Sequence, residues 1–258
     1  MLQKIITAAN KNIKTQIKKA QSSVPFKSQK RSINLHKVFS ITPFTTLDYP
    51  DKVAAVVWFA GCNMRCVYCY NIEVVNSNGN IEMNEVCSFL DRRIGKLNGI
   101  VFSGGECTAN PLFLKLAREV KSRNFCLKVD TNGSHIEILK EAIGEGLIDY
   151  IALDFKAPKE KFIGVTGSNL YEKFISTLKY LLEINFDFEV RTTVHADFLD
   201  ETDVSLMSEI LYDLGYRGNY YLQKFLSTGE NFGNLVDAKS SFDPKKIISK
   251  LPIKLRNF

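Results

Sequence analysis

The chain alternates short apolar runs with helix-like segments, and this alternation restricts its fold more than any other feature. Six runs of five to seven residues, rich in β-branched and aromatic side chains, recur between residues 53 and 225. A run that is apolar throughout is typical of a strand buried on both faces of a sheet. The predicted strands are residues 53–59, 99–103, 126–130, 150–154, 188–194 and 219–225.

The segments between these strands carry apolar residues at helical spacing. The predicted helices are residues 83–94, 111–123, 135–146, 169–185 and 200–215. Strands that alternate with helices predict an α/β fold, with a parallel sheet and helices outside it. Two architectures remain open at this point: a doubly wound open sheet, and a barrel or partial barrel of β/α units. Six units are fewer than the eight of a closed barrel.

Polar motifs follow the ends of the predicted strands. "GCNMRCVYC" follows the first strand, "SGGE" (103–106) the second, "DTNG" (130–133) the third and "DFK" (154–156) the fourth. Arg191 and Gln223 lie within the last two strands. The C-terminal ends of parallel strands meet at one edge, where α/β folds build their sites. Because six strands contribute to one rim, the barrel-like architecture is favoured.

Composition excludes several classes of protein. Of the 258 residues, 45% are hydrophobic and 24% are charged, which is typical of a globular chain with a full core. No apolar run reaches the roughly 18 residues that a transmembrane helix needs. The first residues also lack the apolar block of a secretory signal. We therefore expect a cytoplasmic protein without a transmembrane segment.

The net charge of +6 is concentrated at the N-terminus. Residues 1–37 hold nine of the 34 basic residues and none of the 28 acidic ones, so the rest carries 25 basic and 28 acidic residues. Apolar residues at helical spacing in residues 1–22 predict a basic, solvated helix, with a membrane-surface, partner-binding or transit segment as alternatives. We divide the chain into a basic extension, 1–37, and a main domain, 38–258. A nucleic-acid partner is not expected, because its basic patch would lie on the folded body.

Three cysteines, Cys62, Cys66 and Cys69, fall within eight positions. A disulfide framework is typical of short secreted chains and does not suit this one. Thiolates at this spacing bind zinc or an iron–sulfur cluster. A closed zinc site needs a fourth ligand, which only folding could bring, because every histidine is remote in sequence. A four-iron cluster held by three thiolates leaves one iron open to a substrate or cofactor.

The C-x3-C-x2-C pattern, with Tyr68 before the last cysteine and "SGGE" after the second strand, resembles the signature of radical S-adenosylmethionine (SAM) enzymes. The resemblance runs from about Thr42 to Phe225. It implies a partial TIM barrel of about six β/α units, the radical SAM core. It also implies that Cys62, Cys66 and Cys69 hold a [4Fe–4S] cluster whose open iron is chelated by SAM. Reductive cleavage of SAM would then yield a 5′-deoxyadenosyl radical.

The same resemblance implies the residues that contact SAM. Gly104 and Gly105 would let the backbone approach the methionine moiety, and Glu106 would pair with its ammonium group. Tyr68 and Tyr70 would contact adenine. The motifs "DTNG" and "DFK" place Asp130, Asn132, Asp154 and Lys156 near the SAM carboxylate, where the aspartates can also hold a monovalent cation, and Arg191 completes the set. Without the resemblance, "GGE" predicts a tight turn, the aspartates predict helix caps, and Arg191 predicts a structural ion pair.

Four further residues are expected to have no role in catalysis. Cys107 stands where these enzymes usually carry proline; we interpret it as a tolerated replacement, with an extra ligand as the alternative. Cys87 and Cys126 are predicted to be buried small hydrophobic residues. His195 follows the fifth strand and is predicted to be a surface histidine rather than a site residue.

Within the family, residues 42–71 are similar to the first segment of anaerobic ribonucleotide reductase activating proteins, and "DTNG" and "DFKAP" resemble pyruvate formate-lyase activating enzyme. The resemblance implies an activase that makes a glycyl radical on a partner enzyme, most closely an anaerobic ribonucleotide reductase. Flavodoxin or ferredoxin would supply the electron. The alternatives are a radical SAM enzyme for a small molecule, similar to 7-carboxy-7-deazaguanine synthase, and a non-catalytic iron–sulfur or zinc module.

Overall fold

The structure is a computed structural model, and it describes residues 37–258. The predicted basic extension, apart from Lys37, lies outside the described residues, so the division of the chain at residue 37 stays a prediction. Within residues 37–258, no helix combines the length and apolar character needed to cross a bilayer.

One sheet of eight strands forms the centre of the molecule, in the order β1 to β8. β2 to β8 are parallel, and β1 runs antiparallel to β2. β1 and β8 are the two edges of the sheet, which therefore does not close into a barrel. The strands are β1 (Val38–Thr45), β2 (Ala54–Phe59), β3 (Gly99–Gly104), β4 (Cys126–Thr131), β5 (Tyr150–Asp154), β6 (Phe188–Val194), β7 (Tyr220–Lys224) and β8 (Ile253–Arg256).

The six predicted strands correspond to β2 to β7, each to within one residue at either end. The prediction of an α/β fold with a partial barrel of about six units is confirmed, and β1 and β8 extend the sheet at its edges. All five predicted helices are present, and α2 and α6 are additional. The helices are α2 (Ile72–Asn76), α3 (Met83–Asp91), α4 (Phe113–Ser122), α5 (Ile136–Gly144), α6 (Lys159–Thr166), α7 (Tyr171–Glu183) and α8 (Glu201–Asp213).

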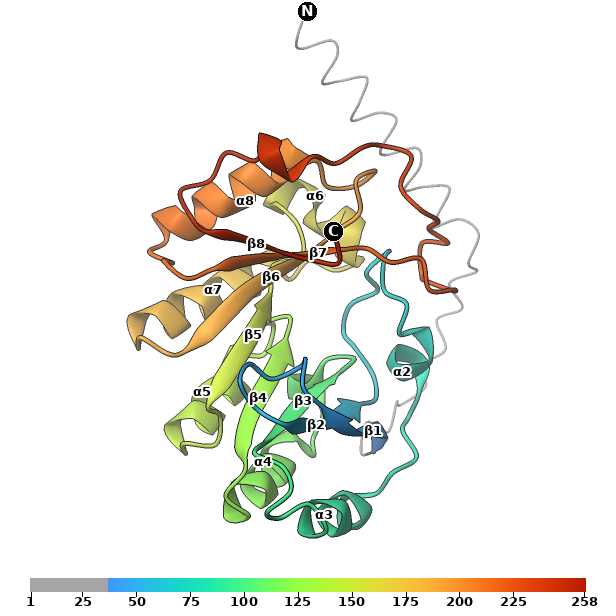
Figure 1. Cartoon of the computed structure of the whole chain (residues 1–258), viewed down its shortest axis with the longest axis vertical. Helices are drawn as coiled ribbons and strands as arrows, with labels where there is room; N and C mark the ends of the chain where they lie inside the picture. Colours follow the sequence, from blue (N-terminus) through green and yellow to red (C-terminus); the bar gives the residue numbers. More distant parts are fainter. Residues whose placement is uncertain (1–36) are drawn as a thin grey trace, which may run out of the picture.

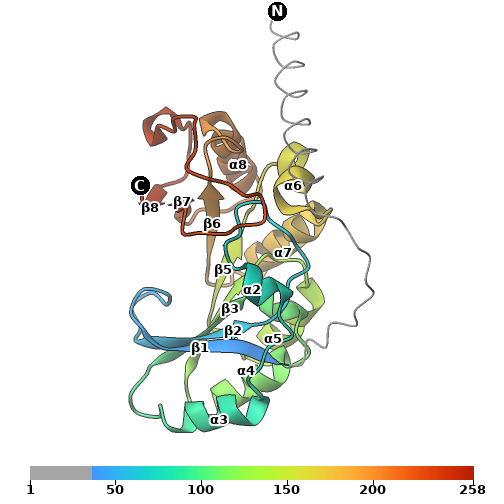
Figure 2. The ribbon, with the colours of Figure 1, turned by 90° about the vertical axis from the view of Figure 1, so that its right-hand side faces the viewer.

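The two faces of the sheet differ in what covers them. In Figures 1 and 2 the helices α3, α4, α5, α7 and α8 follow the outer side of the curved sheet, and the loop between β1 and β2 lies on the inner side. The main hydrophobic core fills the space between the outer face and the helices. On the inner face a small cluster around Tyr49, Val56 and Val101 is separate from it. The rest of the inner face is available for polar side chains.

Candidate active site at the C-terminal rim of the sheet

A cavity of about 260 Å³ lies where the parallel strands end. It is bounded on one side by the cysteine loop after β2 and on the other by side chains of β4, β5 and β6. Every residue that the sequence analysis assigned to the site lines this cavity. These are Cys62, Cys66, Tyr68, Cys69, Tyr70, Gly104, Gly105, Glu106, Asp130, Asn132, Asp154, Lys156 and Arg191. Motifs from five separate segments of the chain therefore meet at one place.

The cysteine loop, residues 61–71, is held in place by backbone hydrogen bonds. The N–H groups of Arg65 and Val67 donate to the carbonyls of Thr166 (2.8 Å) and Val165 (2.9 Å) at the end of α6. From the other side, the N–H of Gly233 donates to the Val67 carbonyl at 2.7 Å. Backbone hydrogen bonds to α6 and to the segment after β7 therefore hold the loop from two sides.

Three thiols face the cavity from this loop. Burial raises the pKa of Cys62 to about 12 and the pKa of Cys66 to about 11. The N–H of Met64 lies 3.4 Å from the Cys62 sulfur and can donate to it. All six cysteines are free thiols. Buried thiols lose their protons when a metal supplies the compensating positive charge.

The ligand arrangement distinguishes between the two kinds of metal site. Among the described residues, no three His, Cys, Asp or Glu side chains stand where they could hold a single metal ion. The cavity lining also contains no histidine and no fourth cysteine within residues 37–258. A closed zinc site draws four ligands onto one ion, whereas the thiolates of an iron–sulfur cluster each bind a different iron. The three cysteines therefore fit a cluster better than a closed zinc site.

Gly104 and Gly105 bring the end of β3 against the end of β2 and the start of the cysteine loop. A Cβ on Gly104, whose φ is +120°, would meet the backbone of Phe59 at 2.4 Å. A Cβ on Gly105 would lie 1.8 Å from the Gly61 carbonyl oxygen. The Glu106 N–H then donates to that same carbonyl at 2.9 Å. The two glycines thus have a packing role at this position, because any side chain would separate the two loops.

Glu106 is a buried carboxylate surrounded by neutral donors. Only 1% of its surface is exposed. Oε1 accepts from the hydroxyls of Thr108 (2.5 Å) and Thr131 (2.7 Å), and Oε2 accepts from the Asn132 N–H at 2.7 Å. Within the described residues, no lysine or arginine pairs with it. A buried carboxylate without a cation suits a ligand that brings its own ammonium group.

Asn132 connects the Glu106 side of the cavity to the cysteine loop. Its Nδ2 donates to Asn63 Oδ1 at 2.9 Å, and Asn63 Nδ2 in turn donates to Ser134 Oγ at 2.7 Å. Asn63 stands between the first and second cysteines of the motif. The position of the first cysteine relative to Glu106 is therefore fixed by side-chain amides.

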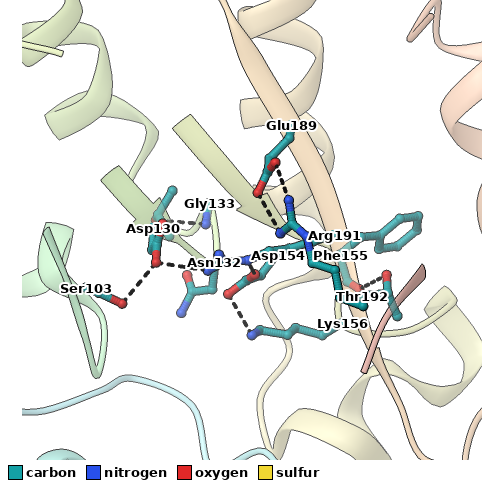
Figure 3. Close-up of polar contacts among 12 residues, drawn as sticks. Ser103, Asp130, Asn132, Gly133, Asp154, Phe155, Lys156, Glu189, Arg191 and Thr192 are labelled. Carbon is teal, nitrogen blue, oxygen red and sulfur yellow. Dashed lines mark hydrogen bonds and ion pairs between the residues drawn. The ribbon is translucent and has the colours of Figure 1, made fainter. Parts of the chain in front are cut away.

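Four charged side chains line the opposite wall, namely Asp130, Asp154, Lys156 and Arg191 (Figure 3). A fifth, Lys128, pairs with Asp130 but is not among the residues that line the cavity. Arg191 lies between the two aspartates: its Nε contacts Asp154 Oδ1 at 2.5 Å and its Nη2 contacts Asp130 Oδ2 at 3.3 Å. Lys156 Nζ lies 2.9 Å from Asp154 Oδ2, and Lys128 Nζ lies 2.6 Å from Asp130 Oδ1. Each of the five side chains is at most 20% exposed.

These neighbours keep the wall ionised. Burial opposes the charge of Asp154, but Arg191 and Lys156 outweigh it and lower the pKa of that carboxyl to about 2. Burial of Asp130 is likewise outweighed by Arg191 and Lys128, and its pKa is below the ordinary value. Despite burial, the pKa values of Lys156 and Arg191 are raised well above their ordinary values, chiefly by the two aspartates. Three cations and two anions leave one positive charge, which suits a ligand carboxylate.

Tyr68 contributes an unpaired polar atom. The side chain is 6% exposed, and its buried hydroxyl has no hydrogen-bond partner among residues 37–258. The Lys156 ammonium lies 6.0 Å from the centre of its ring. Buried hydroxyls are nearly always paired, so this one indicates a bound molecule as its partner. Together with the Glu106 carboxylate and the positive wall, it fits the ammonium and carboxylate groups of SAM.

A monovalent cation beside the aspartates fits less well. Each of the four carboxylate oxygens of Asp130 and Asp154 already has a lysine or arginine nitrogen within 3.3 Å. Ser103 Oγ also donates to Asp130 Oδ2 at 3.1 Å. An alkali ion at any of these oxygens would lie close to a lysine or arginine cation, and like charges repel.

The cavity lining also contains residues that the sequence analysis did not assign to the site. Asp48, Trp58, Ser103, Thr193 and Gln223 are among them. Trp58, Ser103 and Thr193 lie on inner-face positions of β2, β3 and β6, in step with the neighbouring site residues. The two-residue period of a strand was the signal that could have found them.

For the four residues that were expected to have no catalytic role, the structure shows where each side chain lies and how exposed it is. Cys107 is fully buried, donates to the Asp130 carbonyl at 3.3 Å and does not line the cavity. Cys87 and Cys126 are partly exposed, so the prediction that they are buried is wrong. His195 was predicted on the surface, which is also wrong, because it is 3% exposed. Its Nε2 lies 2.9 Å from the Val236 carbonyl, under the segment that follows β7, and it does not line the cavity.

Comparisons with known proteins agree with this site. The sequence profile of the Radical SAM superfamily matches residues 56–208. A relative from Methanocaldococcus jannaschii, named as a glycyl-radical enzyme activating enzyme, is 31% identical over 73% of this chain and 79% of its own length. Pyruvate formate-lyase 1-activating enzyme of Escherichia coli K12 is 26% identical over 69% of this chain and 76% of its own length.

The similarity of this chain to a solved structure concerns the fold alone. Streptococcus suis SuiB bound to S-adenosylmethionine superimposes with a TM-score of 0.58 at 12% identity, over 78% of this chain and 52% of that one. The chain thus spans about half the length of that protein. From the profile match and the relatives, the chain belongs to the radical SAM superfamily, which uses a [4Fe–4S] cluster and SAM, and within it to the enzymes that activate glycyl radical enzymes.

Proposed function

We propose that this enzyme activates an anaerobic ribonucleotide reductase by removing one hydrogen atom from a glycine of that partner. The observation that supports a radical site most strongly is that all thirteen motif residues line one cavity. The similarity of residues 42–71 to ribonucleotide reductase activating proteins favours this partner over other glycyl radical enzymes. The electron donor is proposed to be flavodoxin or ferredoxin.

Each wall of the cavity has its own task in this proposal. Cys62, Cys66 and Cys69 would hold the cluster as thiolates in the clasped loop. When bound, the cluster and SAM would supply the 5′-deoxyadenosyl radical that the removal of a hydrogen atom from the partner's glycine requires. The remaining steps belong to the protein, which must bind SAM in one orientation and exclude water from it.

Three protein groups would orient SAM. Glu106 would accept hydrogen bonds from its ammonium group, because its carboxylate has only neutral donors around it. Lys156 would attract the SAM carboxylate with the excess positive charge of its wall. The Tyr68 hydroxyl would donate to the cofactor, which gives this buried group the partner that it lacks.

The partner's glycine has to reach the cavity from solvent. The sheet is open between β1 and β8, and Tyr70, which lines the cavity, has an exposed side chain. A glycine offers no side chain to recognise, so its neighbours and its backbone must position it. We propose that a loop of the partner enters from this open side.

The test is an assay for the product radical. The protein is reconstituted with iron and sulfide under anaerobic conditions, reduced, and mixed with SAM and an anaerobic ribonucleotide reductase. We expect an organic radical signal in electron paramagnetic resonance that requires both proteins and SAM. Replacement of the partner's radical-site glycine by alanine should remove the signal. SAM cleavage without any radical on the reductase would contradict the proposed partner and leave the radical SAM assignment intact.

A further inference from the structure

The aspartate pair of the charged wall is neutralised from within the protein. Lys128 and Arg191 contact Asp130, while Arg191 and Lys156 contact Asp154. The resemblance to glycyl radical enzyme activators implies a monovalent cation at these carboxylates. The oxygens that such a cation would use are already taken by protein nitrogens, so the arrangement and that implication disagree.

Lys128 is the least exposed of these cations. The residue is 2% exposed, and its Nζ lies 2.6 Å from Asp130 Oδ1. Lys128 and Asp130 are two residues apart on β4, so both side chains stand on the same inner face of the sheet. The strand geometry therefore directs the ammonium group at the carboxylate. A buried lysine of this kind is stable only when an acid pairs with it.

We propose that the ammonium group of Lys128 acts as a built-in monovalent cation at Asp130, so that SAM binds without an added alkali metal ion. This rests on the proposed use of SAM at this site. An ammonium group is a compact point charge of the same sign and size as K⁺. With Lys128 in place, the wall keeps one positive charge in excess and can accept the SAM carboxylate directly.

The geometry also explains why Arg191 alone would not be sufficient to neutralise Asp130. Its contact with Asp130 Oδ2 is 3.3 Å, whereas its contact with Asp154 Oδ1 is 2.5 Å, so the guanidinium is committed mainly to Asp154. The Asp130 Oδ1 atom lies 2.6 Å from the Lys128 ammonium, and no other charged donor in the described part of the chain contacts it. Removing the ammonium group would leave that oxygen as an open ligand for an ion from solution.

The first test uses the wild-type protein with its cluster reconstituted. SAM affinity is measured by equilibrium binding in K⁺, Na⁺ and tetramethylammonium buffers of equal ionic strength. The large organic cation cannot enter the site, so it serves as the ion-free condition. We expect the three affinities to agree within about twofold, since no coupling between ion and cofactor exists. Weakening by about tenfold or more without K⁺ or Na⁺ would overturn the proposal.

The second test replaces the lysine. Lys128→Met should bind SAM about tenfold more weakly in tetramethylammonium, and K⁺ should restore the affinity. The matched control is Lys121→Met, which removes another lysine–aspartate pair, with Asp149 at 2.8 Å, outside the cavity. It should behave as the wild type does in every buffer. Equal binding by Lys128→Met in all buffers would contradict the proposal, and so would a loss that no cation restores.

The double variant Lys128→Met/Asp130→Asn shows where the ion acts. With no carboxylate at residue 130 there is no ligand for K⁺, so its affinity should not depend on the cation. If K⁺ still restored binding, the ion would act elsewhere and the assignment of Lys128 would be wrong. Iron content and far-ultraviolet circular dichroism of each variant confirm that the fold is present. A wild-type protein that binds no SAM in any buffer would instead count against the proposed function.

Discussion

The two walls of the cavity are built in opposite ways. We call residues 61–71 the thiol wall. We call the cavity-lining side chains of Asp130, Asp154, Lys156 and Arg191, together with Lys128 that pairs with Asp130, the charged wall. The thiol wall is positioned by backbone hydrogen bonds, and its functional groups are thiols, of which Cys62 and Cys66 have pKa values raised by burial. The charged wall is positioned by side-chain ion pairs of 2.5–3.3 Å, and each of its groups already has a partner.

The difference between the two walls shows which part of the site is complete when the chain folds and which part still needs a cofactor. The charged wall is completed by the chain itself, because each of its three cations contacts at least one of the two aspartates. The thiol wall has its backbone path but not its ligand, because its three thiols need a metal to favour the thiolate form. We therefore expect the charged wall to determine stability and cofactor orientation, and the thiol wall to determine whether a cluster is present.

The largest effect should come from breaking the thiol wall. Cys62→Ala, Cys66→Ala or Cys69→Ala should each abolish the cluster, whereas the wild type retains about four irons. Iron and sulfide contents after anaerobic reconstitution measure this. Cys126→Ala is the matched control, since Cys126 is a free thiol on β4 that does not line the cavity. An iron content for Cys66→Ala equal to that of Cys126→Ala would contradict the assignment of the ligands.

The second largest effect should come from removing Arg191 from the charged wall. Arg191→Met leaves two buried carboxylates without their shared partner and should lower the free energy of unfolding by about 3–5 kcal/mol. Urea denaturation of the metal-free protein measures the loss. Arg118→Met removes an exposed arginine that pairs with Glu145 and should change stability little. If the two variants unfold at the same urea concentration, the charged wall is not a buried ion-pair system.

A smaller effect tests the contact that joins the cysteine loop to the strand of "SGGE". In Gly105→Ala the new Cβ meets the Gly61 carbonyl, so the loops must separate, at a cost of about 3 kcal/mol. Reconstituted Gly105→Ala should also hold less iron than the wild type. Gly144→Ala serves as the control, because nothing lies within 4 Å of a Cβ at the end of α5. That variant should gain about 1 kcal/mol from helix propensity. A similar gain for Gly105→Ala would show that the two loops are not in contact.

The smallest expected effect is a loss of stability at acidic pH. The pKa of Asp154 is about 2 in the folded protein, below its ordinary value of 3.8. A carboxyl with a lowered pKa stabilises the fold above its unfolded pKa, and the contribution is lost as the pH falls through the folded value. The metal-free protein should therefore lose about 2 kcal/mol between pH 4 and pH 2 through this residue. Asp154→Asn should show a correspondingly flatter dependence of unfolding free energy on pH, and an unchanged slope would contradict the pairing.

The strands that sequence analysis found are those with continuous apolar runs. β1 was missed because it contains Pro43 and polar residues and runs antiparallel at the edge. β8 was missed because its sequence, IKLR, is short and half charged, and only pairing with β7 makes it a strand. Helix α6 follows Pro158 and has little amphipathic pattern, so periodicity could not identify it. Edge elements are defined by their neighbours rather than by their own sequence.

In the site, the motifs predicted which residues meet but not how they are connected. Lys128 lies in the predicted strand 126–130, yet nothing in the sequence shows that its ammonium group reaches Asp130. The location of His195 depends on the segment after β7, whose Val236 carbonyl covers it, and this contact spans 41 residues. Long-range packing of this kind determines burial, and a single sequence does not contain it.

The central claim is that the two walls together hold a cluster and SAM, and the release of 5′-deoxyadenosine tests it most directly. The reconstituted protein is reduced in the presence of SAM, and 5′-deoxyadenosine and methionine are quantified against the protein in wild type and Lys156→Ala. We predict that the wild type releases both products in equal amounts, and that Lys156→Ala keeps its iron but needs a higher SAM concentration. A protein that takes up zinc in place of iron, or that holds four irons and releases no 5′-deoxyadenosine, would contradict the account.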